Sequence, residues 1–138
     1  MSEPKPPLHA DLIWSGSLQF AATTGTTALV IDGDGKAGPS PMDLVALGVV
    51  GCMAADIVAI LQKGRHPFTA MHATFSGTRL PEPPRRFTSI ALEFKVTGDL
   101  AEAAVERAIE LSRTKYCSAL SSLRDDIAVT TTFTILRG

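Results

Sequence analysis

A long apolar stretch, residues 41–63, constrains the fold more than any other part of the sequence. Ser40 can cap a helix there, the proline after it fits the first helical position, and Asp43 stands three residues beyond the cap. At the other end, Gly64 offers a residue for a left-handed cap, and Pro67 cannot continue a helix. The sequence therefore predicts a helix over about 41–63 that is apolar on nearly all sides.

A helix this apolar either crosses a membrane or lies at the centre of a domain or an assembly. Asp43 and Asp56 bracket its most apolar part and leave about a dozen uncharged residues, whereas a span needs about 20, so no membrane association is expected. Gly48 and Gly51 each cost the helix roughly 1 kcal/mol relative to alanine, a penalty that close approach of another helix would explain. We expect a second copy of the chain to cover this helix, in a homodimer.

The rest of the sequence alternates between strand and helix patterns. Strands are expected at 10–22 and 26–31, joined as a hairpin, then at 68–79, 87–97 and 127–136, with a second helix at 100–116. Residues 1–8 carry three prolines and are expected to form a disordered tail before a single domain, 9–138. The order β-β-α-β-β-α-β predicts an α+β fold with mainly antiparallel pairing.

The charge balance, the first residues and the number of cysteines argue against several classes of protein. Thirteen basic against fourteen acidic side chains leave a net charge of -1, which does not favour nucleic acid as a partner. The opening MSEPKPPLHA lacks the basic start and apolar run of a signal peptide, so a cytoplasmic location is expected. The two cysteines, Cys52 and Cys117, are too few for the disulfide framework of a small secreted domain. In the reducing cytoplasm, such a pair is more often catalytic, redox-active or inert.

Candidate metal ligands form no recognisable motif in the sequence. His66 and His72 lack a third ligand at suitable spacing. Asp32 and Asp34 begin like a calcium loop, but the next four residues supply no further acid, so a turn is expected there. No metal and no cofactor are expected.

The two thiols differ in their local chemistry. A cysteine reacts as the thiolate, and at the ordinary pKa of about 8.5 only a few per cent of thiols are ionised at neutral pH. Cys52 lies beyond the reach of its helix's N-terminal dipole, and Asp56 opposes ionisation, so it needs a cation within about 4 Å, worth roughly 4 kcal/mol at an effective dielectric of about 20. Cys117 has Arg113 and Lys115 nearby, and if SALSSLR at 118–124 is helical the thiol lies at the N-terminal end of that helix, where a negative charge is favoured, so Cys117 is expected to be able to ionise without further help.

Three segments together resemble the OsmC/Ohr superfamily, the osmotically inducible and organic hydroperoxide resistance proteins. They are SPMDLVALGVVGC at 40–52, RFTSIALEFKVTG at 86–98 and KYCSALSSL at 115–123, and the resemblance spans about Leu12 to Leu136. It implies an intertwined α+β homodimer whose central helices pack at the dimer core and whose active sites form between subunits.

By this resemblance, Cys52 attacks a hydroperoxide and becomes a sulfenic acid, which Cys117 resolves as a disulfide. The implied function is a peroxidase for organic hydroperoxides in oxidative stress defence, with a thiol reductant as a further partner. Peroxidase subfamilies also carry an arginine in the N-terminal strands and a glutamate after the helix-start proline. Here no arginine precedes Arg65 and Met42 holds the glutamate position, so the sequence is closer to the less characterised OsmC-like branch.

Another cation must then activate Cys52, and the alternatives stay open. Arg113 is preferred because it precedes Cys117 by one helical turn. If no cation reaches the thiol, the protein is a non-catalytic or redox-sensing dimer that binds a small hydrophobic ligand in an interfacial pocket, or a structural dimer with inert thiols. The other candidate cations are Arg79, Arg85 and Arg86.

Overall fold

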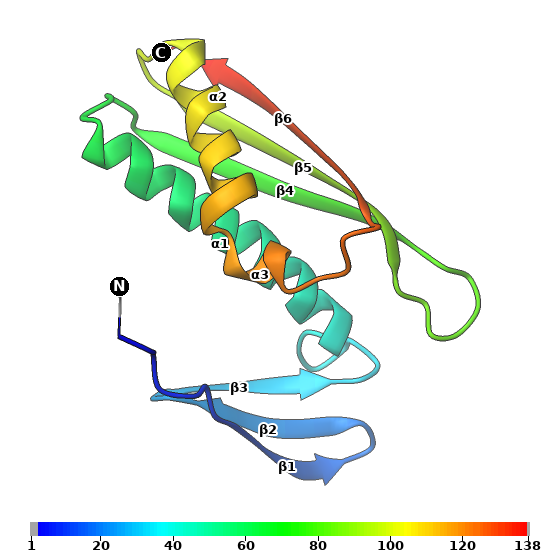
Figure 1. Cartoon of the computed structure of the whole chain (residues 1–138). Coiled ribbons are helices and arrows are strands. Elements are labelled where there is room, and N and C mark those ends of the chain that lie inside the picture. Colours follow the sequence, from blue (N-terminus) through cyan, green and yellow to red (C-terminus); the bar gives the residue numbers. More distant parts are fainter. Residues whose placement is uncertain (1–2, 138) are drawn as a thin grey trace. The chain divides into compact units, whose positions relative to one another are not determined.

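The computed structural model describes residues 3–137 and divides the chain into two compact units, residues 1–45 and 46–138 (Figure 1). Each unit contains one three-stranded sheet. Residues 3–9 of the chain carry no helix or strand and are exposed, while residues 1 and 2 of the predicted tail lie outside the described residues. The prediction of a single domain over 9–138 stays a prediction.

The elements confirm an α+β fold with mostly antiparallel sheets and a long central helix. They are β1 (Ala10–Gly16), β2 (Gln19–Thr24), β3 (Thr27–Asp32), α1 (Pro41–Lys63), β4 (Ala70–Arg79), β5 (Phe87–Thr97), α2 (Glu102–Leu111), the π-helix η1 (Ser112–Tyr116), α3 (Ser118–Ser121) and β6 (Ala128–Leu136).

The first unit has one strand more than the sequence predicts. The expected strand at 10–22 is two antiparallel strands, β1 and β2, and β2 pairs in turn with β3. The chain reverses at Gly16 and Ser17, whose φ angles are 118° and 47°. The prediction of one strand is wrong there, because these left-handed conformations end an extended segment and build a tight turn.

A loop between β3 and α1 is held by the buried side chain of Asp32. Its carboxylate accepts the backbone N–H groups of Ala37 and Asp34 at 2.9 Å and of Lys36 at 3.3 Å. The bonds from Ala37 and Asp34 hold the pKa of Asp32 below its usual range. The predicted turn is confirmed, because backbone groups of the loop occupy both carboxylate oxygens.

The N-terminus of α1 is capped as the sequence predicts. The backbone N–H of Ser40 donates to Asp43 Oδ2 at 3.0 Å, and the N–H of Asp43 donates to Ser40 Oγ at 3.1 Å. At the C-terminus the prediction is wrong by one residue, because Arg65, not Gly64, adopts the left-handed conformation, with φ 57°. The N–H of the next residue then bonds to Leu61 O at 3.0 Å and closes the helix.

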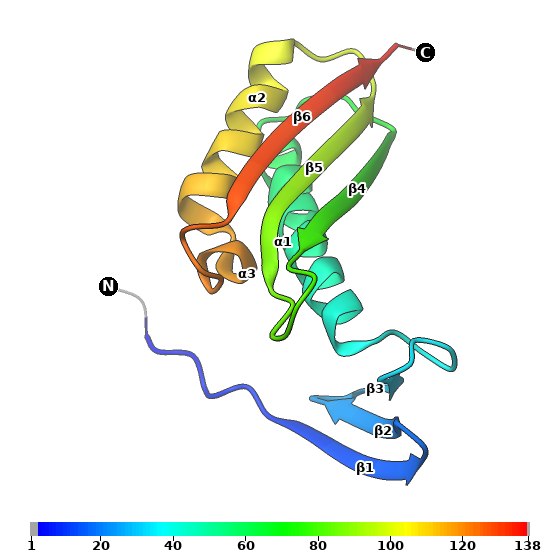
Figure 2. The same ribbon diagram turned by 90° about the vertical axis from the view of Figure 1, so that its right-hand side faces the viewer.

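The second unit packs its helices on one face of a mixed sheet. Strand β5 is central and pairs antiparallel with β4 and parallel with β6. Figure 2 shows α1 and α2 together on one side of this sheet. Alternate residues of β5 and every fourth residue of α1 are buried and form the core: Ile90, Leu92, Phe94 and Val96 with Val49, Met53, Ile57 and Leu61.

Part of α1 outside this core is exposed in the single chain. Several of its apolar or small residues are exposed, namely Leu47, Gly48, Gly51, Ala55 and Ala59. Among the described residues, α1 is the one helix long and apolar enough to cross a membrane, with a mean hydropathy of 2.5 over its best 18 residues. The core helix of a soluble protein also meets this criterion, and the absence of a membrane partner stays an expectation.

Candidate thiol site

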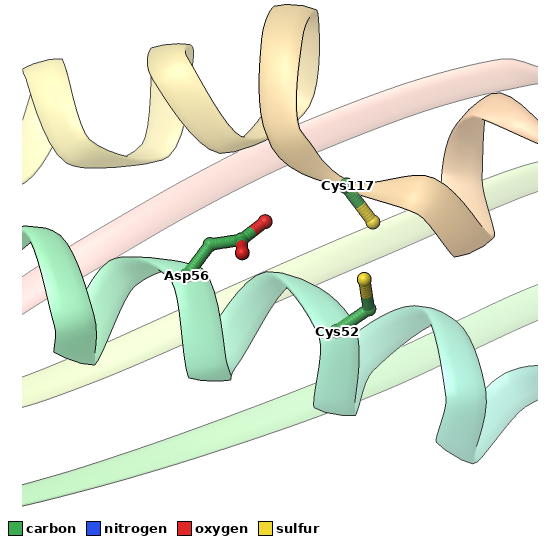
Figure 3. Close-up of side chains that lie close together, drawn as sticks. All are labelled: Cys52, Asp56 and Cys117. Carbon is green, nitrogen blue, oxygen red and sulfur yellow. The ribbon is translucent and has the colours of Figure 1, made fainter. Parts of the chain in front are cut away.

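The structure brings the two predicted cysteines together. The sulfur atoms of Cys52 and Cys117 and a carboxylate oxygen of Asp56 all lie within 4.8 Å of one another (Figure 3). Both thiols are free; Cys52 is half-buried on α1, and Cys117 is buried between η1 and α3. We call these three side chains the thiol site.

Cys117 is held in place by the π-helix that precedes it. Its backbone N–H donates to Ser112 O at 2.8 Å, a bond that spans five residues instead of four. The extra residue ends the helix, and Cys117 becomes the N-cap of α3 with φ -72° and ψ 99°. Its sulfur accepts the backbone N–H of Leu120 at 3.3 Å, as a serine or aspartate oxygen does in a typical cap. The cap orients the sulfur.

Asp56 lies one turn beyond Cys52 on the same face of α1, because residues four apart in a helix are neighbours. The hydroxyl of Ser112 donates to Asp56 Oδ2 at 2.8 Å. Ser112 is fully buried, and it thus holds Asp56 through its hydroxyl and Cys117 through its carbonyl. Sequence reasoning identified Asp56 only as an opposing charge and missed Ser112, whose role depends on a π-helix that no sequence pattern predicted.

The surroundings of Cys117 oppose its ionisation. Burial is the largest effect, and hydrogen bonding to Cys52 and the charges of Cys52 and Asp56 add to it, whereas the Leu120 N–H acts in the opposite direction. Together they raise the pKa of Cys117 to about 11. The prediction that Cys117 can ionise by itself is therefore wrong, because burial, Cys52 and Asp56 all oppose its thiolate, and the effect that favours the thiolate comes from the Leu120 N–H and not from Arg113 or Lys115.

Arg113, the preferred activating cation, makes its contact at the sheet. Its Nη2 donates to Val129 O of β6 at 2.7 Å. Its predicted role at Cys52 stays a prediction, whereas an acidic side chain, Asp56, does lie beside the two thiols. The other three candidates bond to backbone oxygens around the β4–β5 connection: Arg79 to Arg85, Arg85 to Pro81, and Arg86 to Phe87.

Two clefts in the second unit share part of their lining, and Asp56 lines the smaller one. The smaller, about 300 Å³, is lined by Asp56, Ala59, Ile60, Lys63 and Tyr116. The larger, about 640 Å³, shares Ile60, Lys63 and Tyr116 with it and is otherwise mostly aliphatic. Its further lining residues are Leu61, Gly64, His66, Ala101, Ala103, Ala104, Arg107 and Leu111. An apolar molecule in these clefts would have basic groups beside it.

The fold and the thiol site define a class: an α+β protein with one cysteine on a long helix and a second at a helix end beside it. The family of OsmC-like proteins matches residues 33–132, and the chain belongs to this family. The resemblance inferred from the sequence is thereby confirmed.

Relatives of known sequence or structure agree with this membership. Protein YhfA of Escherichia coli strain K12 is 38% identical over 132 residues, which cover 94% of this chain and 98% of YhfA. A hypothetical protein from Aquifex aeolicus VF5 superposes with a TM-score of 0.90 at 22% identity, covering 97% of this chain and 99% of that one. An organic hydroperoxide resistance protein OsmC from Legionella pneumophila has a TM-score of 0.71 at 17% identity, with 96% and 99% covered. At these identities the two structures share the fold alone.

Proposed function

We propose that the protein is a thiol-dependent peroxidase that reduces organic hydroperoxides in oxidative stress defence. One observation carries the proposal: two cysteines 65 positions apart in the sequence have their sulfur atoms within 4.8 Å of each other. Family membership supports it, as does the name of the Legionella relative. For a disulfide to form, the two sulfur atoms must approach from a separation within 4.8 Å to the S–S bond length of about 2.05 Å.

The reaction proceeds in two steps. The Cys52 thiolate attacks one peroxide oxygen, the O–O bond breaks, and the alcohol leaves after it takes a proton, so Cys52 becomes a sulfenic acid. The Cys117 thiolate then attacks the Cys52 sulfur, the S–O bond breaks, the hydroxide that leaves takes a proton from solvent to become water, and a disulfide forms. An external thiol reductant restores both thiols by exchange. Cys52 reacts first because it is half-buried, whereas Cys117 is buried and disfavours the charged form.

The cleft lined by Asp56 and the larger cleft that shares its lining support an organic rather than an inorganic peroxide. Aliphatic groups of Ala59 and Ile60 border the smaller cleft, and the larger continues along α2. Binding an apolar substituent there removes its surface from water, which stabilises the complex by roughly 25 cal/mol per Å². Hydrogen peroxide gains nothing from such a surface.

A homodimer is the assembly we propose for this activity. Gly48 and Gly51 on α1 have open space where a side chain would begin. In the first unit, large apolar side chains are exposed as well, among them Leu12, Ile13, Trp14 and Val30. A second copy would cover such surfaces, and it could also bring a cation to Cys52.

Oxidation by an organic hydroperoxide tests the function directly. Reduced protein, pretreated with a chelator, is mixed with one equivalent of cumene hydroperoxide and analysed by mass spectrometry after alkylation. We expect loss of both free thiols and a peptide cross-link between Cys52 and Cys117, with one cumyl alcohol formed per chain. Thiols that survive excess peroxide would contradict the proposal.

The second step should depend on pH. Burial, the largest cause of the raised pKa of Cys117, is still present once Cys52 is a sulfenic acid. The thiolate fraction of Cys117 should therefore rise with pH between pH 7 and pH 10, by up to about tenfold per unit, and disulfide formation should accelerate accordingly. Trapping the sulfenic acid with dimedone at each pH measures this step apart from the first. A rate independent of pH in this range would show that Cys117 does not attack as a thiolate.

A second candidate function rests on the acid beside the thiols. The carboxylate of Asp56 and the raised pKa of Cys117 both oppose a reactive thiolate. The alternative is a dimer without catalysis that holds a small hydrophobic ligand, with the cysteines inert or redox-sensing. Retention of a hydrophobic fluorescent probe together with unreactive thiols would favour this function over the peroxidase.

A further inference from the structure

We infer that the reduced thiol site binds a divalent zinc ion through Cys52, Asp56 and Cys117. This departs from the expectation of no metal, which considered only histidines and loop acids. The three side chains come from two segments of the chain, and each directs a potential ligand atom toward the others (Figure 3). The binding itself does not depend on the proposed peroxidase activity.

The ligand set favours zinc over harder cations. Two thiolates select a borderline-soft ion, and calcium or magnesium would require oxygen ligands instead. With Zn–S near 2.3 Å and Zn–O near 2.0 Å, a tetrahedral site has ligand atoms about 3.5–3.8 Å apart. The observed separations, all within 4.8 Å, approach that spacing before any ion draws the ligands inward. Three protein ligands leave the fourth position to water or another small ligand.

Two ligands are already oriented by neighbouring groups. Ser112 donates its hydroxyl to Asp56 Oδ2 at 2.8 Å, and the Leu120 N–H donates to the Cys117 sulfur at 3.3 Å. Metal ligands commonly receive such supporting hydrogen bonds, which fix their orientation. A bound cation would also explain why Asp56 lies beside the two thiols, because its carboxylate opposes a free thiolate but stabilises a cation.

Zinc and the disulfide exclude each other, since both use the same two sulfurs. This consequence rests on the proposed function. Oxidation of the bound form balances as Zn(SR)₂ + R′OOH + 2H⁺ → RSSR + R′OH + H₂O + Zn²⁺, in which the two sulfurs are oxidised, the peroxide is reduced and the ion leaves unchanged. Zinc release would then accompany peroxide reduction.

Cobalt substitution and zinc competition test the site. Reduced protein titrated with Co²⁺ should develop a thiolate-to-cobalt charge-transfer band that saturates at one ion per chain, and Zn²⁺ should abolish it. Cys52→Ser and Cys117→Ser should each remove most of the band. Ser112→Ala should weaken zinc binding by about 10- to 100-fold in competition with a chromophoric chelator, and Asp56→Asn by more.

Controls separate this inference from the peroxidase proposal. Glu106→Gln, an exposed acid on α2, should bind zinc as the unmodified protein does. Asp56→Asn should lose zinc affinity yet keep both thiols reactive toward peroxide in chelator, because both sulfurs remain; circular dichroism checks its fold. Absence of the cobalt band, or zinc affinity unaffected by Asp56→Asn, would overturn the zinc site. Unreactive thiols in chelator would contradict only the peroxidase.

Discussion

Replacing Cys52 by serine is expected to abolish the consumption of organic hydroperoxide, with a loss of at least about a thousandfold, because a serine hydroxyl is not ionised at neutral pH and removing a nucleophile has effects of this size or larger. Cys117 cannot substitute for it: the thiol is buried, and its pKa is raised to about 11. The measurement is the initial rate of peroxide loss with a thiol reductant present.

Cys117→Ser provides the matched control. This variant should still reduce one equivalent of peroxide and then stop with a sulfenic acid on Cys52 that dimedone traps. The two variants thus separate attack from resolution. If Cys52→Ser kept its first turnover while Cys117→Ser lost it, the order of attack would be reversed, and burial would be a poor guide to reactivity here.

Local signals in the sequence were sufficient for α1. The capping pair Ser40 and Asp43 and the turn residues after Lys63 define a helix whose observed bounds match the predicted ones. The turn at Gly16 and Ser17 was missed because both flanks read as strand and a single glycine inside such a pattern is ambiguous. Arg65 was missed because propensity assigns the left-handed position to glycine, whereas here the N–H of Gly64 still bonds to Ile60 O and the left-handed residue comes one position later.

The thiol site was predictable in part. Resemblance to a family paired Cys52 with Cys117, although nothing local to either residue indicated the other. Asp56 follows from helical spacing, four residues after Cys52. The hydrogen bond from Ser112 to Asp56 could not be predicted in this way. It requires that α1 and η1 pack together and that the π-helix shifts the register of the chain by one residue. Position along the chain put Arg113 near Cys117, whereas its hydrogen bond directs it to β6.

Replacing Gly51 by leucine is expected to convert a dimer into monomers. In one chain, a Cβ at Gly51 meets no atom within 4 Å, so the substitution is sterically free and improves helix propensity by about 1 kcal/mol. In a homodimer with two-fold symmetry, each subunit would bring one copy of the new leucine side chain to the interface. Overpacking of about 1–3 kcal/mol at each copy then gives about 2–6 kcal/mol, or a dissociation constant at least about 30-fold higher. Analytical ultracentrifugation over a concentration series measures it.

The sign of the effect separates a covered helix from an uncovered one. Gly51→Ala should weaken association if a partner helix packs there, and should only stabilise the chain if water does. Glu106→Leu, which places a leucine at an exposed position on α2, should leave the oligomeric state unchanged. An interface at α1 would be contradicted if the Gly51→Leu variant were as dimeric as the unmodified protein, or if the unmodified protein were monomeric at all concentrations. Any cation that activates Cys52 would then have to come from the same chain.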